Sequence, residues 1–214
     1  MAGITAVIFD VGNVLYDWDP RFLYERLIED EQALDSFLRD VVTVEWHLQH
    51  DAGRPFAETS AELAALYPEH AELIRAWGPR FQESIRGRID GMEQLLADLS
   101  RSAVPLFAIT NFSHEFWPSF RAKETDLFDR FQDVLVSGEV GLIKPDPAIY
   151  HLALKRFGLA AEEALFVDDR QDNVDAAAAL GIGGHLFRDA ATLRAELVKL
   201  GLFAENTETR PHPA

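Results

Sequence analysis

Five short runs of hydrophobic residues along the chain predict buried strands. The first, residues 4–9, is rich in β-branched side chains and stops at Asp10 and Gly12. Similar runs occupy residues 104–110, 134–137, 164–167 and 184–187. Helical patterns separate the later runs, and strands that alternate with helices are typical of a parallel sheet covered by helices on both faces. The sequence therefore predicts an α/β protein with a doubly wound, Rossmann-like core.

The helices expected between these strands have recognisable starts and stops. Over residues 92–99 the apolar side chains recur at spacings of three and four. Asp146 followed by Pro147 is an N-cap with proline at the first helical position, and Gly158 ends that helix. Two more helices are predicted over residues 173–180, before Gly181, and 192–200, before Gly201.

A long segment between the first and second predicted strands does not follow this alternation of strands and helices. Residues 20–89 contain no convincing strand, and their apolar residues keep helical spacing, as in Leu73, Trp77, Phe81 and Ile85. A segment of this length is too long for a connecting loop. We therefore expect a helical-bundle cap over residues 18–89, inserted into a core formed by residues 1–17 and 90–204. The polar residues 205–214 are expected to form a flexible tail.

Composition excludes several classes of function. The chain has 214 residues, 20 basic and 36 acidic, and a formal net charge of −16. Nucleic acids and anionic membranes require a basic face, so neither is expected as a partner. No Cys is present, which excludes thiolate catalysis and Cys-ligated metal centres. No signal segment or membrane span is recognisable, so we expect a cytoplasmic protein, a monomer by default, although a dimer is possible.

Polar residues that can carry chemistry follow four of the predicted strands. They are Asp10, Thr110, Asn111, Lys144, Asp168 and Asp169. Ligands of parallel α/β sheets bind outside the carboxyl ends of the strands, so these side chains should converge on one crevice. Carboxylates crowded together need a counter-charge, and Mg²⁺ with oxygen ligands supplies one where a phosphate also binds. This inventory favours phosphoryl transfer to a carboxylate nucleophile.

The four segments FDVGNV, FAITN, GLIKPDP and LFVDDRQDN, in this order, resemble the haloacid-dehalogenase superfamily of aspartate-nucleophile phosphohydrolases. The resemblance covers nearly the whole chain, including a helical cap after the first strand. It implies a Mg²⁺-dependent phosphatase that acts on a small phosphorylated metabolite through an aspartyl-phosphate. The FDxGNV start, Asn111 with the later FWP, and the KPxxxIY stretch are similar to bacterial sugar-1-phosphate phosphatases, which implies a sugar phosphate as substrate.

The resemblance also implies roles for particular residues. Asp10 would be the nucleophile and a metal ligand, with the Gly12 carbonyl and the pair Asp168 and Asp169 as further ligands. Thr110 and Lys144 would bind the phosphate and assist catalysis, and Asn111 would also contact the substrate. In the expected cap, Arg54 and His47 are candidates for contacts with the rest of the substrate.

One departure from the family pattern concerns the proton donor. The usual first motif, DxDGT, has a second Asp as general acid, but this chain has Gly12 at that position. Either the leaving group needs less help, as an anomeric or acyl phosphate would, or Asp17, Asp19 or His47 substitutes. Two alternatives therefore stay open: a binding protein with weak or no catalysis, and a 2-haloacid dehalogenase. The acidic pair after the fourth strand disfavours the dehalogenase.

Overall fold

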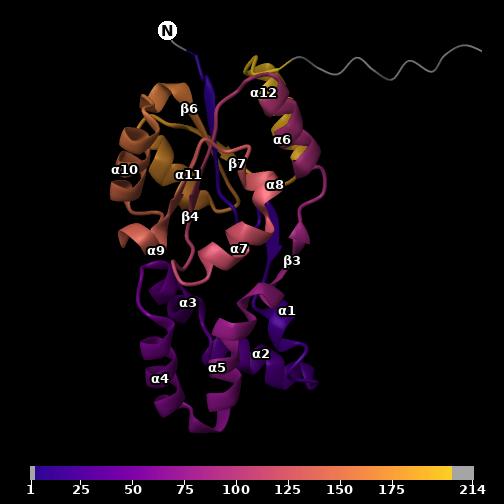
Figure 1. The fold of residues 1–214 in the computed structure, drawn as a ribbon, viewed down its shortest axis with the longest axis vertical. Coiled ribbons are helices and arrows are strands. Elements are labelled where there is room, and N and C mark those ends of the chain that lie inside the picture. Colours follow the sequence, from indigo (N-terminus) through magenta and orange to yellow (C-terminus); the bar gives the residue numbers. More distant parts are fainter. Residues whose placement is uncertain (1–2, 204–214) are drawn as a thin grey trace, which may run out of the picture.

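A parallel sheet of five strands forms the centre of the protein, and the computed structural model describes residues 3–203 (Figure 1). The strands are β1 (Ala6–Phe9), β4 (Leu106–Thr110), β5 (Asp133–Val136), β6 (Ala164–Asp168) and β7 (Gly183–Leu186). Their order across the sheet is β5-β4-β1-β6-β7, and all neighbours are parallel. The predicted doubly wound α/β core is confirmed, with each strand within two residues of its expected bounds.

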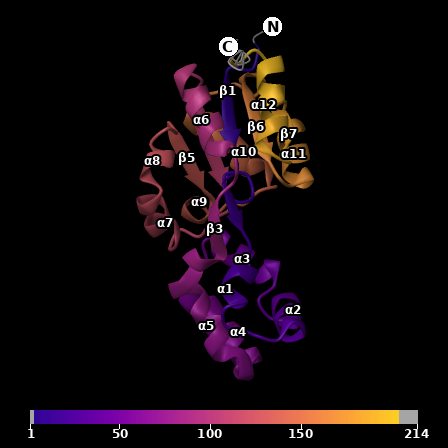
Figure 2. The same cartoon turned by 90° about the vertical axis from the view of Figure 1, so that its right-hand side faces the viewer.

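Alternation along the strands supplies one hydrophobic core on each face of the sheet. Val7 and Phe9 of β1 belong to one buried cluster, and Ala6 and Ile8 belong to the other. Helices α6 (Met92–Arg101) and α12 (Ala190–Lys199) pack on the first cluster, whereas α10 (Pro147–Phe157) and α11 (Gln171–Ala178) pack on the second (Figure 2). The shorter helices of the core are α7 (Trp117–Lys123), α8 (Thr125–Phe128), α9 (Ser137–Val140) and the 3₁₀ turn η3 (Ala161–Glu163).

The helix boundaries of α10 follow from local chemistry. The Asp146 carboxylate accepts a hydrogen bond from the Ala148 N–H at 2.8 Å, and Pro147 occupies the first helical position. At the other end Gly158 has a φ of 70°, the left-handed conformation that terminates helices at low cost. The predicted N-cap and stop of this helix are both confirmed.

The segment between β1 and α6 forms a separate layer below the sheet (Figure 1). It contains a set of helices, namely α1 (Arg21–Tyr24), α2 (Glu31–Asp40), α3 (Val44–Asp51), α4 (Phe56–Leu66), η1 (Pro68–His70), α5 (Ala71–Arg80) and η2 (Phe81–Ser84). Two antiparallel strands, β2 (Tyr16–Trp18) and β3 (Ile85–Arg88), flank this set. We call this segment the cap and propose residues 18–89 as its limits. Helices α1–α5 make up most of it.

Strand β3 differs from the expectation for this segment, which the sequence analysis took to contain helices only. Ile85 continues the helical spacing of Leu73, Trp77 and Phe81, yet it lies in β3 opposite Trp18. The helix α5 ends at Arg80, and the chain needs an extended segment to return to the core beside β2. Pairing with β2 therefore makes Ile85 part of a strand, although the spacing of the apolar residues before it is helical.

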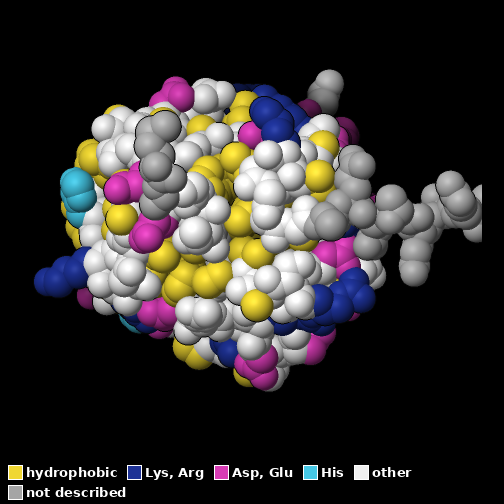
Figure 3. All heavy atoms as spheres, turned by 90° about the horizontal axis from the view of Figure 1, so that it is seen from above, with side chains coloured by type: hydrophobic (Ala, Val, Ile, Leu, Met, Phe, Trp, Pro, Cys, Tyr) yellow, Lys and Arg dark blue, Asp and Glu magenta, His cyan; other side chains and the backbone are white. Residues whose placement is uncertain are grey.

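Two further expectations concern the surface and the ends of the chain. Within residues 3–203 no helix combines the length and the apolar character that crossing a membrane requires. The face of the core remote from the cap shows hydrophobic side chains near its centre, with charged side chains of both signs around them (Figure 3). The predicted flexible tail, 205–214, lies outside the described residues.

Candidate active site

The sheet brings the predicted residues together at the carboxyl ends of its three central strands. Asp10 directly follows β1, Thr110 is the last residue of β4, and Asp168 is the last residue of β6. Because β4 and β6 flank β1, these three side chains lie at one end of adjacent strands. Lys144 reaches the same place from the loop between α9 and α10.

Lys144 is the centre of the site. Its ammonium nitrogen lies 2.8 Å from Oδ1 of Asp10 and 2.7 Å from Oδ2 of Asp168. The lysine is 3% exposed, and Asp168 is fully buried. Burial alone would lower the pKa of Lys144, but the two carboxylates raise it above its usual value. The lysine therefore stays charged and ties the ends of two strands together.

Asn173 on α11 also holds Asp168, and the sequence analysis did not identify it as a site residue. Its amide nitrogen donates to both carboxylate oxygens of Asp168, at 3.0 and 3.1 Å. The Arg170 N–H adds a third hydrogen bond at 2.9 Å. Asn173 lies five residues after Asp168, on the first turn of α11. In LFVDDRQDN, a polar residue this soon after the strand end could have indicated a partner for Asp168.

Asn111 positions the lysine through its backbone. The Asn111 side chain accepts from the Lys144 N–H at 2.8 Å and donates to the Lys144 carbonyl at 3.1 Å. Both functional groups of the amide are therefore used within the protein. Asn111 lines the cavity, as expected for a residue near substrate, but its hydrogen bonds serve the Lys144 loop.

Negative charge exceeds positive charge among these buried groups. Burial raises the pKa of Asp10, and Asp168 adds to the shift, while Lys144 opposes it. The pKa of Asp169 is also raised, first by burial and then by Asp168. Three carboxylates and one ammonium leave a net negative charge, which a further cation would balance.

The donor set fits a hard divalent cation. Asp10, Asp168 and Asp169 each place a carboxylate oxygen within 4.8 Å of the others. Oxygen ligands of this kind suit Mg²⁺, which binds through a few carboxylates and shares its other positions with water and phosphate. The raised pKa values of Asp10 and Asp169 are the electrostatic counterpart of the same fit, since a cation stabilises both as carboxylates.

The loop after β1 places Gly12 on the cavity wall. The backbone of Gly12 forms an isolated β-bridge with Tyr16. A β-carbon at position 12 would meet no atom within 4 Å. Asn13, next to it, has a φ of 55°, and its side chain accepts from the Trp18 N–H at 3.1 Å. Beyond Asp10 the loop therefore contributes no acidic side chain to the site, and space for a side chain is open at Gly12.

A cavity of about 150 Å³ extends from this site toward the cap. Its wall contains Asp10, Gly12, Thr110, Lys144 and Asp169 at the sheet end. Farther out the wall is mainly apolar, with Trp18, Val44, Leu48, Trp77, Phe81, Ile85, Phe112, Phe116 and Phe120. The cavity therefore has a charged floor and a largely hydrophobic upper part.

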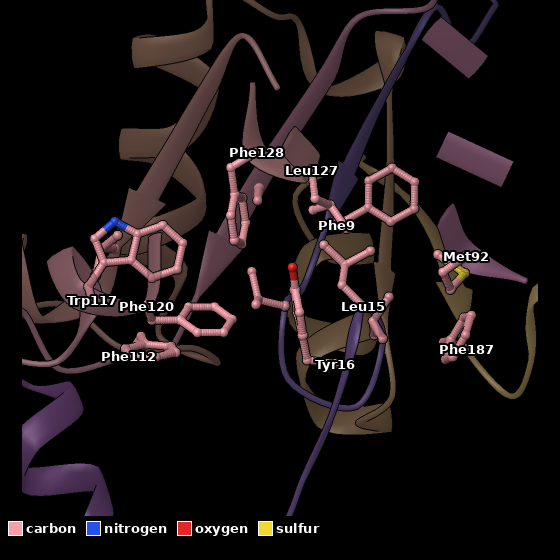
Figure 4. Close-up of a cluster of buried hydrophobic side chains, with 14 of the residues drawn as sticks. Phe9, Leu15, Tyr16, Met92, Phe112, Trp117, Phe120, Leu127, Phe128 and Phe187 are labelled. Carbon is pink, nitrogen blue, oxygen red and sulfur yellow. The ribbon is translucent and has the colours of Figure 1, made fainter. Parts of the chain in front are cut away.

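The aromatic part of the wall is continuous with the core. Figure 4 shows Phe112, Phe120 and Tyr16 at the edge of a cluster that reaches Trp117 and Phe128. Phe112 and Phe120 stack with ring centroids 5.4 Å apart, and Tyr16 meets Phe120 edge-on at 4.9 Å. The Tyr16 hydroxyl donates to Glu124 at 2.8 Å. Each ring is thus held by several neighbours, which gives this side of the cavity a fixed shape.

Helix α3 covers the cavity from the cap side. Val44, His47, Leu48 and Asp51 all line it, and their spacing of three, four and seven residues places them on one helix face. His47 is 5% exposed, and neither ring nitrogen has a hydrogen-bond partner among the described residues. Burial and the neighbouring His50 lower the pKa of His47 to about 3, while the Val42 backbone opposes the shift. His47 is therefore a neutral polar group in the cavity wall.

Arg54 and two of the suggested proton donors lie away from the cavity wall. The Arg54 guanidinium bonds with Gln49 and with Glu62, the latter at 2.8 Å. Asp17 lies 3.7 Å from Arg86, and Asp19 accepts from the Arg21 N–H at 2.7 Å. Arg54 is thus paired within the cap and is not among the residues that line the cavity, so its contact with substrate stays a prediction. Asp17 and Asp19 are likewise engaged elsewhere.

Asp51 is the additional carboxyl group of the cavity wall, and the sequence analysis did not single it out. It is the last residue of α3, and burial raises its pKa to about 7 although Lys144 opposes the shift. Its backbone carbonyl accepts a hydrogen bond of 2.6 Å from the Ser137 hydroxyl of α9. Asp51 is therefore attached to the core as well as to the cap.

Comparison with known proteins places the chain in a family. A model for haloacid dehalogenase-like hydrolases matches residues 4–181. The sesquiterpene phosphatase astK of Aspergillus oryzae is 28% identical over 194 residues, which are 87% of this chain and 92% of that protein. The phosphoserine phosphatase of Thermus thermophilus is 35% identical over 160 residues, 74% of this chain but 58% of that protein.

Solved structures share the fold. A haloacid-dehalogenase-family enzyme of Bacteroides thetaiotaomicron, in complex with magnesium and inorganic phosphate, superimposes with a TM-score of 0.67 at 20% identity. The match covers 87% of this chain and 96% of that one. The predicted enzyme class, a phosphoric monoester hydrolase, is confirmed by the family match and by the phosphatases among the relatives. This chain belongs to the haloacid dehalogenase-like hydrolase family.

Proposed function

We propose that this enzyme is a Mg²⁺-dependent phosphatase that hydrolyses a small phosphorylated metabolite through an aspartyl-phosphate on Asp10. The observation that carries the proposal is the buried group of Asp10, Lys144 and Asp168 at adjacent strand ends, with Asp10 on the floor of a cavity. An acidic site of this kind can accept a phosphoryl group only if the negative charge of the phosphate is balanced. Lys144 and a divalent cation would provide that balance.

Each residue then has a role in the reaction. Asp10 attacks the phosphorus atom, and the ester oxygen leaves toward the cavity. Lys144 and the Thr110 hydroxyl bind the phosphoryl oxygens, while Asn111 and Asn173 hold Lys144 and Asp168 in place. Mg²⁺, held by Asp10, Asp168, Asp169 and the Gly12 carbonyl, would stabilise negative charge on the transferring group.

The substrate range is the finer part of the proposal. The names of the relatives point to both an apolar substrate, a sesquiterpene phosphate, and a polar one, phosphoserine. The resemblance to sugar-1-phosphate phosphatases adds sugar phosphates as candidates. All are phosphate monoesters of modest size, so the phosphate end of the site suits each of them. Selection among them must come from the upper part of the cavity.

The test is phosphate release from an aryl phosphate, such as p-nitrophenyl phosphate, with Mg²⁺ and with EDTA. We expect turnover with the metal, loss of turnover in EDTA, and loss of at least about 10³-fold in Asp10→Asn. Asp129→Asn, which changes an exposed carboxylate paired with Arg121 at 2.7 Å, is the matched control. Equal release from Asp10→Asn and the parent protein would overturn the proposal, and no release from either would favour a binding protein without catalysis.

A further inference from the structure

The upper cavity offers apolar surface that the protein itself does not cover. Val44 and Leu48, one turn apart on α3, line the cavity and belong to neither buried hydrophobic cluster. Val44 is 56% exposed although it is β-branched and apolar. Exposed apolar side chains that face a cavity over a reactive site are expected where a hydrophobic group of a ligand covers them. Phe112, Phe116 and Phe120 make another part of the wall apolar, although these rings also pack in the core.

Several polar side chains of the wall already have hydrogen-bond partners, whereas on α3 both ring nitrogens of His47 have none among the described residues. His50 bonds with the Thr59 hydroxyl at 2.6 Å, Tyr16 donates to Glu124, and both groups of Asn111 bond with the Lys144 backbone. A sugar ring buried here would bring several hydroxyls, and each one without a partner would weaken binding. An apolar group would instead gain from leaving water.

We propose that the organic part of the substrate is a small apolar group, aryl or alicyclic, carried on a phosphate monoester, and that sugar phosphates are poor substrates. This rests on the proposed phosphatase activity and adds the class of substrate to it. The cavity volume of about 150 Å³ includes the charged floor, so an apolar group that shares the cavity with the phosphate must be small. The phosphate would lie on the charged floor, and the apolar group would contact Val44 and Leu48.

A matched pair of substrates tests the class directly. Cyclohexylmethyl phosphate and glucose 6-phosphate are both esters of a primary alcohol on a six-membered ring, and they differ chiefly in the ring oxygen and the hydroxyls. We expect kcat/KM for cyclohexylmethyl phosphate to exceed that for glucose 6-phosphate by about 10- to 100-fold. Equal values, or a preference for glucose 6-phosphate, would overturn the substrate class while leaving the phosphatase proposal intact. Failure to hydrolyse these two and p-nitrophenyl phosphate would instead overturn the phosphatase proposal.

A substitution in the cavity wall tests whether Leu48 contributes to the preference for an apolar substrate. Leu48→Asn places an amide in the cavity wall and should reduce the ratio of the two kcat/KM values by about tenfold. Leu66→Asn is the matched control, because Leu66 on α4 is 74% exposed and does not line the cavity. Thermal unfolding followed by circular dichroism shows whether each variant is folded. An unchanged ratio in Leu48→Asn would contradict the assignment of this wall.

A second inference starts from the missing side chain at Gly12. The carboxyl groups that line the cavity are Asp10 and Asp169 on its floor and Asp51 on its cap side. Asp51 therefore lines the same cavity as the nucleophile Asp10, from the cap side. The described residues give its carboxyl group no hydrogen bond or ion pair within the protein.

The backbone around Asp51 is anchored on the core. The Ser137 hydroxyl donates to the Asp51 carbonyl and accepts from the Phe112 N–H at 2.9 Å. Two residues later the cap approaches α9 closely, since a β-carbon on Gly53 would lie 3.0 Å from the Gly138 carbonyl oxygen. These contacts fix Asp51 relative to the strand ends, as a catalytic role would require.

We infer that the Asp51 carboxyl group is the general acid and base of the reaction. As the Asp10 carboxylate forms its bond to phosphorus, the P–O bond to the leaving group breaks and the Asp51 proton passes to the leaving oxygen, giving the alcohol. The Asp51 carboxylate then takes a proton from the water that attacks the aspartyl-phosphate, which restores Asp10 and releases phosphate. A carboxyl group whose pKa burial raises to about 7 is suited to both transfers.

The test exploits leaving groups of different basicity. Asp51→Asn should lower kcat for cyclohexylmethyl phosphate by about 10²–10⁴-fold, because an alkoxide needs a proton. It should lower kcat for p-nitrophenyl phosphate less than about tenfold, because that leaving group departs as an anion. Equal losses on both substrates would indicate a structural role, and no loss on either would exclude Asp51 from catalysis.

A rescue variant distinguishes a proton-transfer role of Asp51 from a structural one. Gly12→Asp adds a carboxyl group where a β-carbon meets no atom within 4 Å. In the Asp51→Asn background it should recover at least about tenfold of the lost turnover of cyclohexylmethyl phosphate. Recovery limited to the alkyl substrate supports a proton donor supplied by the cap in place of the loop after β1.

Discussion

Two buried acidic regions of this protein differ in how their charge is balanced. Asp98 on α6, 7% exposed, is bonded by the guanidiniums of Arg101 and Arg194 and by the Gln94 amide at 2.8 Å. Burial would raise the pKa of Asp98, but these hydrogen bonds hold it below its usual value. One carboxylate there has two cationic partners.

The active site has the opposite balance. Asp10 and Asp168 share the single ammonium of Lys144, with Asp169 close by, and the pKa values of Asp10 and Asp169 are raised. The difference shows that burial alone does not determine the ionisation of a carboxylate; the ratio of its charged partners does. The region around Asp98 joins α6 to α12, whereas the region around Asp10 can bind a cation and a phosphate.

A large effect is expected from removing Lys144, the lysine that pairs with both Asp10 and Asp168. Lys144→Met leaves Asp10 and Asp168 without a counter-charge and should destabilise the metal-free protein by about 3–5 kcal/mol. Turnover of p-nitrophenyl phosphate should also fall by at least about 10²-fold, because Lys144 binds the phosphoryl group. Urea unfolding and phosphate release measure the two effects.

Two controls accompany this variant. Lys155→Met changes an exposed lysine of α10 and should alter neither property. Arg101→Met removes the more exposed partner of Asp98 and should cost less than about 1 kcal/mol, because Arg194 remains. A loss in Arg101→Met as large as that in Lys144→Met would contradict the contrast between the two regions.

Removing the carboxylate of the balanced region should affect stability alone. Asp98→Asn leaves Arg194 without its buried partner and should cost about 1–3 kcal/mol. For a protein of this size that corresponds to a fall in Tm of roughly 2–4 °C per kcal/mol. The same preparation should keep kcat and KM for p-nitrophenyl phosphate. A changed kcat would mean that the two regions are coupled.

A smaller effect is expected where neutral groups support the acidic site. Asn173→Ala removes two hydrogen bonds to Asp168 and should lower kcat/KM by about tenfold, because Asp168 is then free to move. The apparent affinity for Mg²⁺, measured from the metal dependence of turnover, should fall as well. Gln171→Ala, at an exposed position on the same helix turn, is the control.

The pH dependence of stability gives the most specific test of the charge balance at Asp10. Because the pKa of Asp10 is higher in the folded than in the unfolded protein, its contribution becomes unfavourable as pH rises above about 4. The Tm of metal-free Asp10→Asn minus that of the parent protein should therefore grow between about pH 4 and about pH 8. Differential scanning calorimetry in EDTA measures the difference, and a value independent of pH would disprove the raised pKa.

Much of the active site could be predicted because parallel strands end at one edge of a sheet. The positions of Asp10, Thr110 and Asp168 follow from the hydrophobic runs that precede them, and the cap of α10 follows from Asp146 and Gly158. These features depend on contacts within a few residues or on the general architecture of the sheet.

The missed features depend on how the cap lies on the core. Asp51 is an ordinary residue at a helix end until Ser137 and Gly138 place α3 over the strand ends. Arg54 follows it by three residues and turns outward to Glu62. Strand β3 was missed because Ile85 continues a helical pattern, and its pairing with Trp18 is a contact between distant parts of the chain.

The ribbon of β2 and β3 carries both crossings of the chain between the cap and the core. The two crossings are hydrogen-bonded neighbours, with Tyr16 opposite Arg88 and Asp17 opposite Gly87. An insertion that leaves and returns at adjacent points can be exchanged for another without changing the order of the sheet strands. The ribbon is therefore a natural pair of fusion points for chimeric enzymes, in which a transplanted cap would bring its own proton donor and hydrophobic wall to the same nucleophile.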